Sequence, residues 1–139
     1  MKFLLDTNII SELIAPRPNP RVVEWIERQD PQQIYLSVIT LGEIRKGIEK
    51  LEPSKRKNTL QTWLENDLLL RFHGRIAEID APIMLRWGAL MGRLEKSGRS
   101  IHVLDALIAA IALEGQYILV TRNDQDFEHT GAAIFNPYK

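Results

Sequence analysis

The chain has no cysteine, no long apolar run and no excess of either charge. The absence of cysteine from all 139 residues excludes disulfides, thiolate zinc sites and cysteine nucleophiles, and it is typical of proteins in a reducing compartment. No stretch approaches the roughly 20 apolar residues of a membrane-spanning helix, and the amino-terminal segment has no small-residue cleavage site. We therefore expect a cytoplasmic protein that makes no contact with membranes.

Several functional motifs are also absent. The chain has no G-x-S-x-G elbow, no P-loop and no G-x-G-x-x-G, so serine hydrolases, nucleoside triphosphatases and dinucleotide-binding enzymes have no motif in their favour. Its three histidines, at positions 73, 102 and 129, lack the spacing of a zinc site. Eighteen basic and eighteen acidic residues balance, so contact with a nucleic acid would need a local basic patch.

The composition is that of an ordinary globular protein, with 45% hydrophobic and 26% charged residues. At this length we expect a single domain, residues 1–139. Apolar periodicity predicts an alternation of strands and helices, which indicates an α/β fold with a small, mainly parallel sheet flanked by helices on both faces. The expected strands are 2–5, 34–38, 76–79, 117–121 and 132–135, and the expected helices are 8–14, 20–29, 40–50, a helix from 54, 82–96 and 102–115.

Helix-capping signals mark several of these boundaries. Asn19 followed by proline and Ser54 are expected helix starts, and Gly115 is an expected left-handed helix end. In open α/β sheets, ligands gather beyond the carboxyl ends of the strands. Functional side chains are therefore expected directly after residues 5, 38 and 121.

Acidic residues occur near two of these strand ends, and each has an ordinary structural explanation. Asp6 ends an apolar strand and could either cap the next helix or bind a ligand, with Thr7 and Asn8 as supporting polar groups. Glu43 follows the second strand, but Thr40-x-x-Glu43 also has the pattern of a capping box. Taken singly, neither residue decides between a cap and a site.

Asp105 is harder to explain structurally, because almost every face of its helix is apolar. A buried carboxylate needs a nearby cation or dipole, or it neutralises. The loop TRNDQDF after the fourth strand adds Asn123, Asp124 and Asp126, which are also ordinary turn residues. Lys96, Arg99 and His102 precede Asp105; they fit either a solvated helix face or a patch that holds flanking phosphates.

All these acids arrive at one predicted edge of the sheet. Carboxylates packed together repel one another unless a multivalent cation joins them. Oxygen ligands without cysteine or paired histidine favour Mg²⁺ or Mn²⁺ over zinc. The pattern therefore predicts metal-assisted hydrolysis of a phosphodiester.

Four segments carry a resemblance to a known family: LLDTNIISEL, SVITLGEIRKGI, HVLDALIAAIAL and ILVTRNDQDF. In this order and spacing they resemble the PIN-domain family, and within it the VapC/FitB-like toxins of toxin–antitoxin pairs. The closing AAIFNPYK is similar to the tail of the FitB-like branch. The resemblance covers essentially the whole chain.

The resemblance implies a Mg²⁺-dependent endoribonuclease, with Mn²⁺ as a possible substitute. Asp6, Glu43 and Asp105 match the first three acids of the family. Asp6 and Asp105 would bind the metal, and Glu43 would hold a water on the metal or act as a base. Where some members carry an aspartate after Thr-Arg, this chain has Asn123, so Asn123 and Asp126 are expected to share the fourth role, in preference to Asp124.

The resemblance also implies partners: an RNA substrate, a second copy of the chain in a homodimer, and a cognate antitoxin whose carboxyl-terminal segment enters the acidic pocket. Two other functions stay open at this point. The chain could be a phosphatase with an aspartyl nucleophile, although Asn8 stands where that chemistry usually needs a second acid. It could also be a PIN-like protein retained for binding alone, with its acids serving as helix caps.

Overall fold

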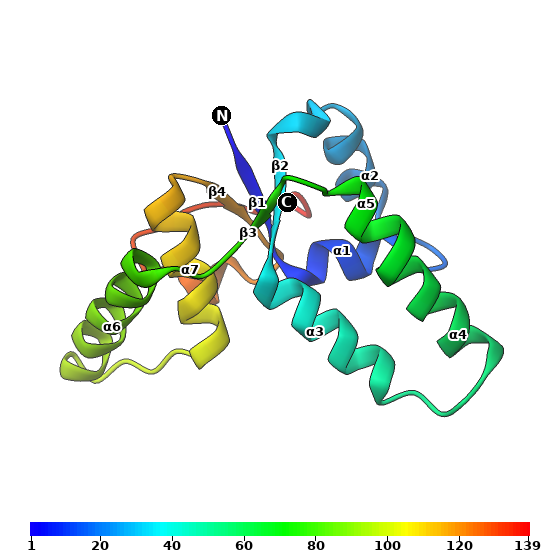
Figure 1. Ribbon diagram of the computed structural model, residues 1–139. Helices are drawn as coiled ribbons and strands as arrows, with labels where there is room; N and C mark the ends of the chain where they lie inside the picture. The colour runs from blue at the N-terminus through cyan, green and yellow to red at the C-terminus, as the bar shows by residue number, and fades with distance from the viewer.

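A five-stranded sheet organises the computed structural model, which describes residues 1–139 (Figure 1). All neighbouring strands are parallel, in the order β3-β2-β1-β4-β5. The prediction of an α/β fold is confirmed, and the sheet is wholly parallel. The strands are β1 (Phe3–Leu5), β2 (Ile34–Ser37), β3 (Ile76–Ala77), β4 (Ile118–Val120) and β5 (Ala133–Phe135).

Helices cover both faces of the sheet, as predicted (Figure 1). None of them combines the length and the apolar character needed to cross a bilayer. On one face lie α1 (Thr7–Leu13), α2 (Pro20–Glu27), α3 (Val38–Glu49) and a helix from α4 (Lys55–Thr62) through the π-helical segment η2 (Trp63–Leu68) to α5 (Leu69–Arg71), and on the other lie α6 (Ala81–Lys96) and α7 (Val103–Gly115). Short 3₁₀ turns form η1 (Pro31–Gln33) and η3 (Asp124–Phe127).

The alternation of side chains along each strand supplies two separate hydrophobic cores. Leu4 and Leu119 point to the core under α6 and α7, and their neighbours Leu5 and Val120 point to the core under α1, α3 and η2. All four side chains are buried. Short apolar strands that are buried on both faces are what a parallel sheet between two helical layers requires.

The central strand β1 is where the direction of the chain through the sheet reverses. From β1 the chain proceeds to β2 and β3 on one side, and then crosses to β4 and β5 on the other. The Asp6 amide donates a hydrogen bond to the Val120 carbonyl at 2.9 Å, which holds the carboxyl ends of β1 and β4 together. Such a reversal point is where open α/β sheets form their ligand crevice.

The structure confirms two predicted helix starts and corrects a third. Asn19 and Ser54 cap α2 and α4 through their side chains. The capping box expected at Thr40 is wrong: α3 begins at Val38, and the Ser37 hydroxyl accepts a hydrogen bond from the Thr40 amide at 3.2 Å. Because the helix follows β2 without a loop, Thr40 lies inside its first turn, and Glu43 has no capping role there.

The left-handed residue at the end of α7 is Gln116 (φ 57°), so the prediction for Gly115 is also wrong. Gly115 is needed for a different reason. A Cβ atom at this position would lie 2.2 Å from Cε2 of Tyr117, whose ring packs edge-on against Tyr35 with the centroids 5.1 Å apart. The glycine makes room for this aromatic pair.

We therefore expect Gly115→Ala to lower the free energy of unfolding by about 2 kcal/mol, because the Tyr117 ring must move out of its packed position. Thermal denaturation measures this as a fall in Tm of several degrees. Gly92→Ala in α6 is the matched control, because a Cβ there meets nothing within 4 Å. It should be neutral or slightly stabilising. Equal melting temperatures for the two variants would contradict this explanation.

Candidate active site

The three acids expected at the site, Asp6, Glu43 and Asp105, line one open hollow of about 500 Å³ at the carboxyl edge of the sheet. Asp6 follows β1, Glu43 lies in α3 directly beyond β2, and Asp105 lies in the first turn of α7. Asn123, at the end of the loop that leaves β4, lines the same hollow. These residues, up to 117 positions apart in the sequence, thus line one hollow. It lies beyond the carboxyl ends of the strands, where a site was expected.

Asp6 both caps a helix and faces the hollow, so the two explanations offered for it are compatible. One carboxylate oxygen accepts the Thr7 amide at 2.8 Å. The other accepts the Thr121 hydroxyl at 2.8 Å and the Asn8 side-chain amide at 3.3 Å. Only 6% of Asp6 is exposed, and this burial raises its pKa; the hydrogen bonds from Thr121, Thr7 and Asn8 lower the pKa, and the charge of Glu43 raises it.

Glu43 is positioned by Thr7 and not by its own helix end. The Thr7 hydroxyl donates to Oε1 of Glu43 at 2.6 Å and also lies 3.1 Å from the Thr40 hydroxyl. Oε2 of Glu43 accepts no hydrogen bond and is available to a ligand or a water molecule. Thr7 therefore orients one oxygen of this carboxylate and leaves the second free.

Asp105 accepts no hydrogen bond and forms no ion pair. Burial raises its pKa to about 6, and the charges of Asp6, Asp126 and Glu43 add to this effect, whereas His102 opposes it. The expectation that a carboxylate on this apolar helix needs a partner is therefore not met within the protein. A bound cation from solution would supply the missing partner of Asp105.

The three polar residues of the loop after β4 lie in different surroundings. Asn123 lines the acidic hollow, and Asp126 lines an adjoining hollow of about 300 Å³ that shares Asp105 with the first. Asp124 is engaged elsewhere: Lys139 donates to it at 2.9 Å, and this hydrogen bond lowers its pKa. Asn123 and Asp126 thus line the two hollows that contain Asp105, and their shared role stays a prediction.

The donor chemistry of the hollow fits a hard divalent cation. None of the ion pairs in the structure involves Asp6, Glu43 or Asp105. The acids do not form a ready-made cage, because no group of three or more acidic, histidine or cysteine side chains is close enough to hold a metal ion. Two carboxylates completed by water and substrate oxygens are, however, the surroundings that Mg²⁺ commonly takes in enzymes.

Residues that were given no role from the sequence line the hollow or support the acids that do. Thr121, at the end of β4, donates to Asp6; Arg122, Glu12 and Tyr138 line the opening. Thr121 and Arg122 could have been found from the sequence, because polar residues directly after a buried strand indicate the ligand edge of the sheet. Tyr138 belongs to the closing segment AAIFNPYK, but no local pattern assigned it to the site, because only folding brings it to Glu12 of α1 and to Arg122.

Two of the three basic residues before Asp105, His102 and Arg99, have polar neighbours within the protein. The His102 ring nitrogen Nδ1 accepts the Leu104 amide at 3.3 Å and so caps α7. Nη1 of Arg99 lies 2.8 Å from Nε2 of His129 across the adjoining hollow. Phosphate binding by this group stays a prediction.

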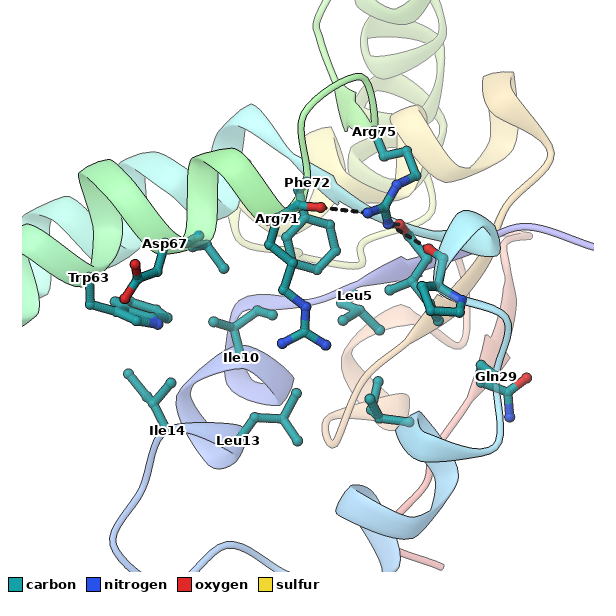
Figure 2. A pocket seen from close by; sticks show the side chains of 14 residues that line it. Leu5, Ile10, Leu13, Ile14, Gln29, Trp63, Asp67, Arg71, Phe72 and Arg75 are labelled. Carbon is teal, nitrogen blue, oxygen red and sulfur yellow. Dashed lines mark hydrogen bonds between the residues drawn. The ribbon is translucent and has the colours of Figure 1, made fainter.

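A second, mainly apolar hollow of about 360 Å³ lies between α1, the end of α2 and the η2–α5 helix. Figure 2 shows Ile10 and Leu13 of α1 and the next residue, Ile14, facing Trp63 and Phe72 across it, and Arg75 donating to nearby carbonyl oxygens. None of the acids of the candidate site lines this hollow. Its surface suits apolar side chains, so it is not the place for chemistry on a phosphate.

Comparison with known proteins gives matches along nearly the whole chain. The profile of the family described as PIN domain matches residues 3–133. Toxin FitB of Neisseria gonorrhoeae is 38% identical over 135 residues, covering 97% of each chain. VapC ribonuclease Y4jK of Sinorhizobium fredii is 35% identical over 136 residues, covering 98% of this chain and 97% of the relative.

A solved structure is similar to the same extent. The crystal structure of FitAcB from Neisseria gonorrhoeae contains a chain that superposes with a TM-score of 0.93, at 38% identity over 98% of each chain. The likeness therefore extends to the arrangement of strands and helices as well as to the sequence.

The raised pKa of Asp105 predicts a stability cost for the metal-free protein. Between pH values near 4 and 6 the folded protein holds a proton that the unfolded chain has released, so stability falls as the pH rises through this range. Above that range the cost is complete. We expect Asp105→Asn in EDTA to melt several degrees above the unmodified protein at pH 7.5 and to lose this advantage near pH 4.

Asp124→Asn is the matched control in the same denaturation series. The ionised form of Asp124 is stabilised by Lys139, so its replacement should give no gain in Tm at pH 7.5. If Asp105→Asn melts at or below the unmodified protein at pH 7.5, the carboxylate is compensated within the fold and this electrostatic account fails.

Proposed function

Since this chain belongs to the PIN-domain family, we propose that it is a Mg²⁺-dependent endoribonuclease that hydrolyses RNA phosphodiester bonds and acts as the toxin of a toxin–antitoxin pair. The observation that carries the proposal is the meeting of Asp6, Glu43 and Asp105 around one open hollow without a Lys or Arg partner. Desolvated carboxylates without an internal cation are costly to the fold, and they are retained where a cation is part of function.

Each carboxylate is assigned a separate task. Asp6 and Asp105 would hold the Mg²⁺ ion, with Mn²⁺ as an alternative. When bound, such an ion stabilises negative charge on the scissile phosphate and on the departing oxygen, and makes water more acidic. Oε2 of Glu43 accepts the proton of the attacking water, while Thr7 fixes the other oxygen of this residue.

Asn123 and Asp126 would share the fourth position. Asn123 reaches the same hollow as the three acids, so its side-chain amide can hold a phosphate oxygen or a water molecule. Asp126 adds negative charge beside Asp105, as its effect on the pKa of Asp105 indicates. This assignment keeps Asp126 near the ion without making it a direct ligand.

The names of the relatives support the substrate and the biological role. One is called a toxin and another a ribonuclease. A cell that produces such an enzyme needs a means to silence it, so we propose a cognate antitoxin whose carboxyl-terminal segment enters the acidic hollow. We further propose a cytoplasmic homodimer; α6 exposes Met84 and Leu85 (41% and 77%), which are apolar side chains suited to an interface.

The test is cleavage of single-stranded RNA by the purified protein. We expect fragments with Mg²⁺ or Mn²⁺ and none in EDTA. Asp6→Asn and Asp105→Asn should each reduce the rate at least about 100-fold, because each removes a charge from the ion site. Asp124→Asn removes a charge of the same kind that is already paired with Lys139, and it should retain near-normal activity.

Two measurements separate the other functions. A phosphomonoester such as p-nitrophenyl phosphate would be hydrolysed by an aspartyl phosphatase and should be left intact here. Added Mg²⁺ should raise the Tm of the unmodified protein, through linkage of binding to folding, and leave that of Asp105→Asn unchanged. Intact RNA under all metal conditions, with pure and folded protein, would remove the enzymatic proposal.

A further inference from the structure

An arginine that lines the acidic hollow has an aromatic ring, and no charged or hydrogen-bonding group, as the partner of its side chain. Arg122 follows β4 and lines the same hollow as the three carboxylates. Its guanidinium donates no hydrogen bond to any other residue and takes part in no ion pair. A free cation beside unpaired carboxylates, close enough to share their hollow but not bound to them, indicates a ligand with negative charge of its own.

The backbone of Arg122 is held on both sides. Its amide donates to Oδ1 of Asn8 at 3.2 Å, and its carbonyl accepts from the Asn136 side chain at 3.0 Å. The same Asn8 side chain donates to Asp6. Asn8 therefore fixes the backbone of Arg122 relative to the Asp6 carboxylate.

The side chain of Arg122 rests on an aromatic ring from the carboxyl terminus. Its guanidinium carbon lies 4.9 Å from the ring centroid of Tyr138. A guanidinium that stacks on an aromatic face keeps its N–H groups, which lie in the plane of the group, free for a planar or tetrahedral anion. The contact with Tyr138 thus holds the guanidinium beside the ring and uses none of its hydrogen-bond donors.

Tyr138 is itself anchored, through Glu12. The Tyr138 hydroxyl donates to Oε1 of Glu12 at 2.9 Å, and Oε2 of Glu12 accepts the Asn19 amide at 3.1 Å. Burial and the hydrogen bond to Glu12 raise the pKa of Tyr138 to about 12, so the hydroxyl remains a donor. Both oxygens of Glu12 are occupied, which explains why this acid lines the hollow without belonging to the catalytic set.

The last residues of the chain are fastened at further points. Lys139 pairs with Asp124, the Tyr138 amide donates to the Asn136 side chain at 2.9 Å, and Nη1 of Arg21 approaches the Tyr138 carbonyl at 3.4 Å. These contacts hold the segment Asn136–Lys139, and with it Tyr138, the residue of the segment that lines the hollow. The pair of Asp124 with Lys139 therefore helps to hold Tyr138 in place beside Arg122.

We propose that Arg122 is the phosphate-binding residue of the RNA site and that Tyr138 is its positioning residue: Arg122 holds a backbone phosphate next to the one at the carboxylates. This inference rests on the proposed function, because it assumes that RNA enters this hollow. A polyanion that approaches three carboxylates on a molecule of zero net charge needs a local cation. Arg122 is the guanidinium that lines the hollow with them.

The test measures binding separately from cleavage. A fluorescein-labelled single-stranded RNA is titrated with protein in EDTA, and Kd is determined by anisotropy between 50 and 200 mM KCl. Arg122→Ala should raise Kd about tenfold and reduce the slope of log Kd against log[KCl] by about 0.7, the value for one lost contact to a single-strand phosphate. Arg28→Ala, which removes an arginine paired with Glu24 on α2, is the control and should change neither quantity.

Tyr138 is tested by two substitutions that separate its ring from its hydroxyl. Tyr138→Phe keeps the ring under Arg122 and loses the bond to Glu12, so it should bind RNA nearly as the unmodified protein does. Tyr138→Leu removes the ring and should raise Kd severalfold, without changing the salt slope as much as Arg122→Ala does. Equal losses in both variants would overturn the positioning role.

Kinetic measurements with Mg²⁺ add an independent readout. Loss of a contact to a flanking phosphate should raise KM more than it lowers kcat, because the contact is present in both the ground state and the transition state. If Arg122→Ala is poorly folded by its Tm, Arg122→Gln, which keeps most of the side-chain length but not the charge, replaces it. Unchanged Kd, salt slope and KM in a folded variant would overturn the inference.

The outcomes separate this inference from the proposed function. RNA that binds in an Arg122-dependent way but is never cut would refute hydrolysis and support the phosphate site. Cleavage that is indifferent to Arg122 would refute the phosphate site and leave the ribonuclease in place.

Discussion

The hydrogen bonds that hold Asp6 at the junction of β1 and β4 are the contacts on which the rest of the site depends. Thr7, Asn8 and Thr121 donate to this one buried carboxylate, and the Asp6 amide donates to the carbonyl of Val120. Two of these donors begin α1, directly after β1, and Thr121 directly follows β4, so they come from the chain just beyond both strands, where the sheet reverses direction. A desolvated charge is tolerable only with such donors around it, and even so its pKa is raised.

From this fixed carboxylate the other groups of the site are placed by a few rigid contacts. Thr7, which begins α1 beside Asp6, positions Glu43 of α3, and Asn8 positions the backbone of Arg122. Asp105 arrives on a buried helix whose core side chains leave it little freedom to move. The fold therefore presents unpaired negative charge at a definite place, at a cost in stability that functional sites commonly carry.

Local patterns were sufficient for most of the fold. The short apolar strands, the prolines after helix caps and the spacing of apolar residues in α6 and α7 predicted the five strands and the presence of helices on both faces of the sheet, because each of these signals acts over a few residues. The two wrong predictions, the capping box at Thr40 and the left-handed Gly115, concern positions whose structure depends on a neighbouring element or side chain that the local pattern does not include. At Thr40 the helix begins earlier because β2 leads into it directly, and at Gly115 the ring of Tyr117 occupies the space of a side chain.

For the site, the sequence alone determined which oxygen-bearing residues follow the strands, and the parallel order of the strands was enough to expect Asp6, Glu43 and Asp105 at one edge. Only the tertiary structure decided which of the acids are free. Asp124 is paired with Lys139, and Glu12 accepts hydrogen bonds from the Tyr138 hydroxyl and the Asn19 amide. Asp6, Glu43 and Asp105 form no ion pair. The physical reason is distance along the chain: pairing with residues up to 126 positions away depends on where the carboxyl-terminal segment docks, and no short-range pattern encodes that docking.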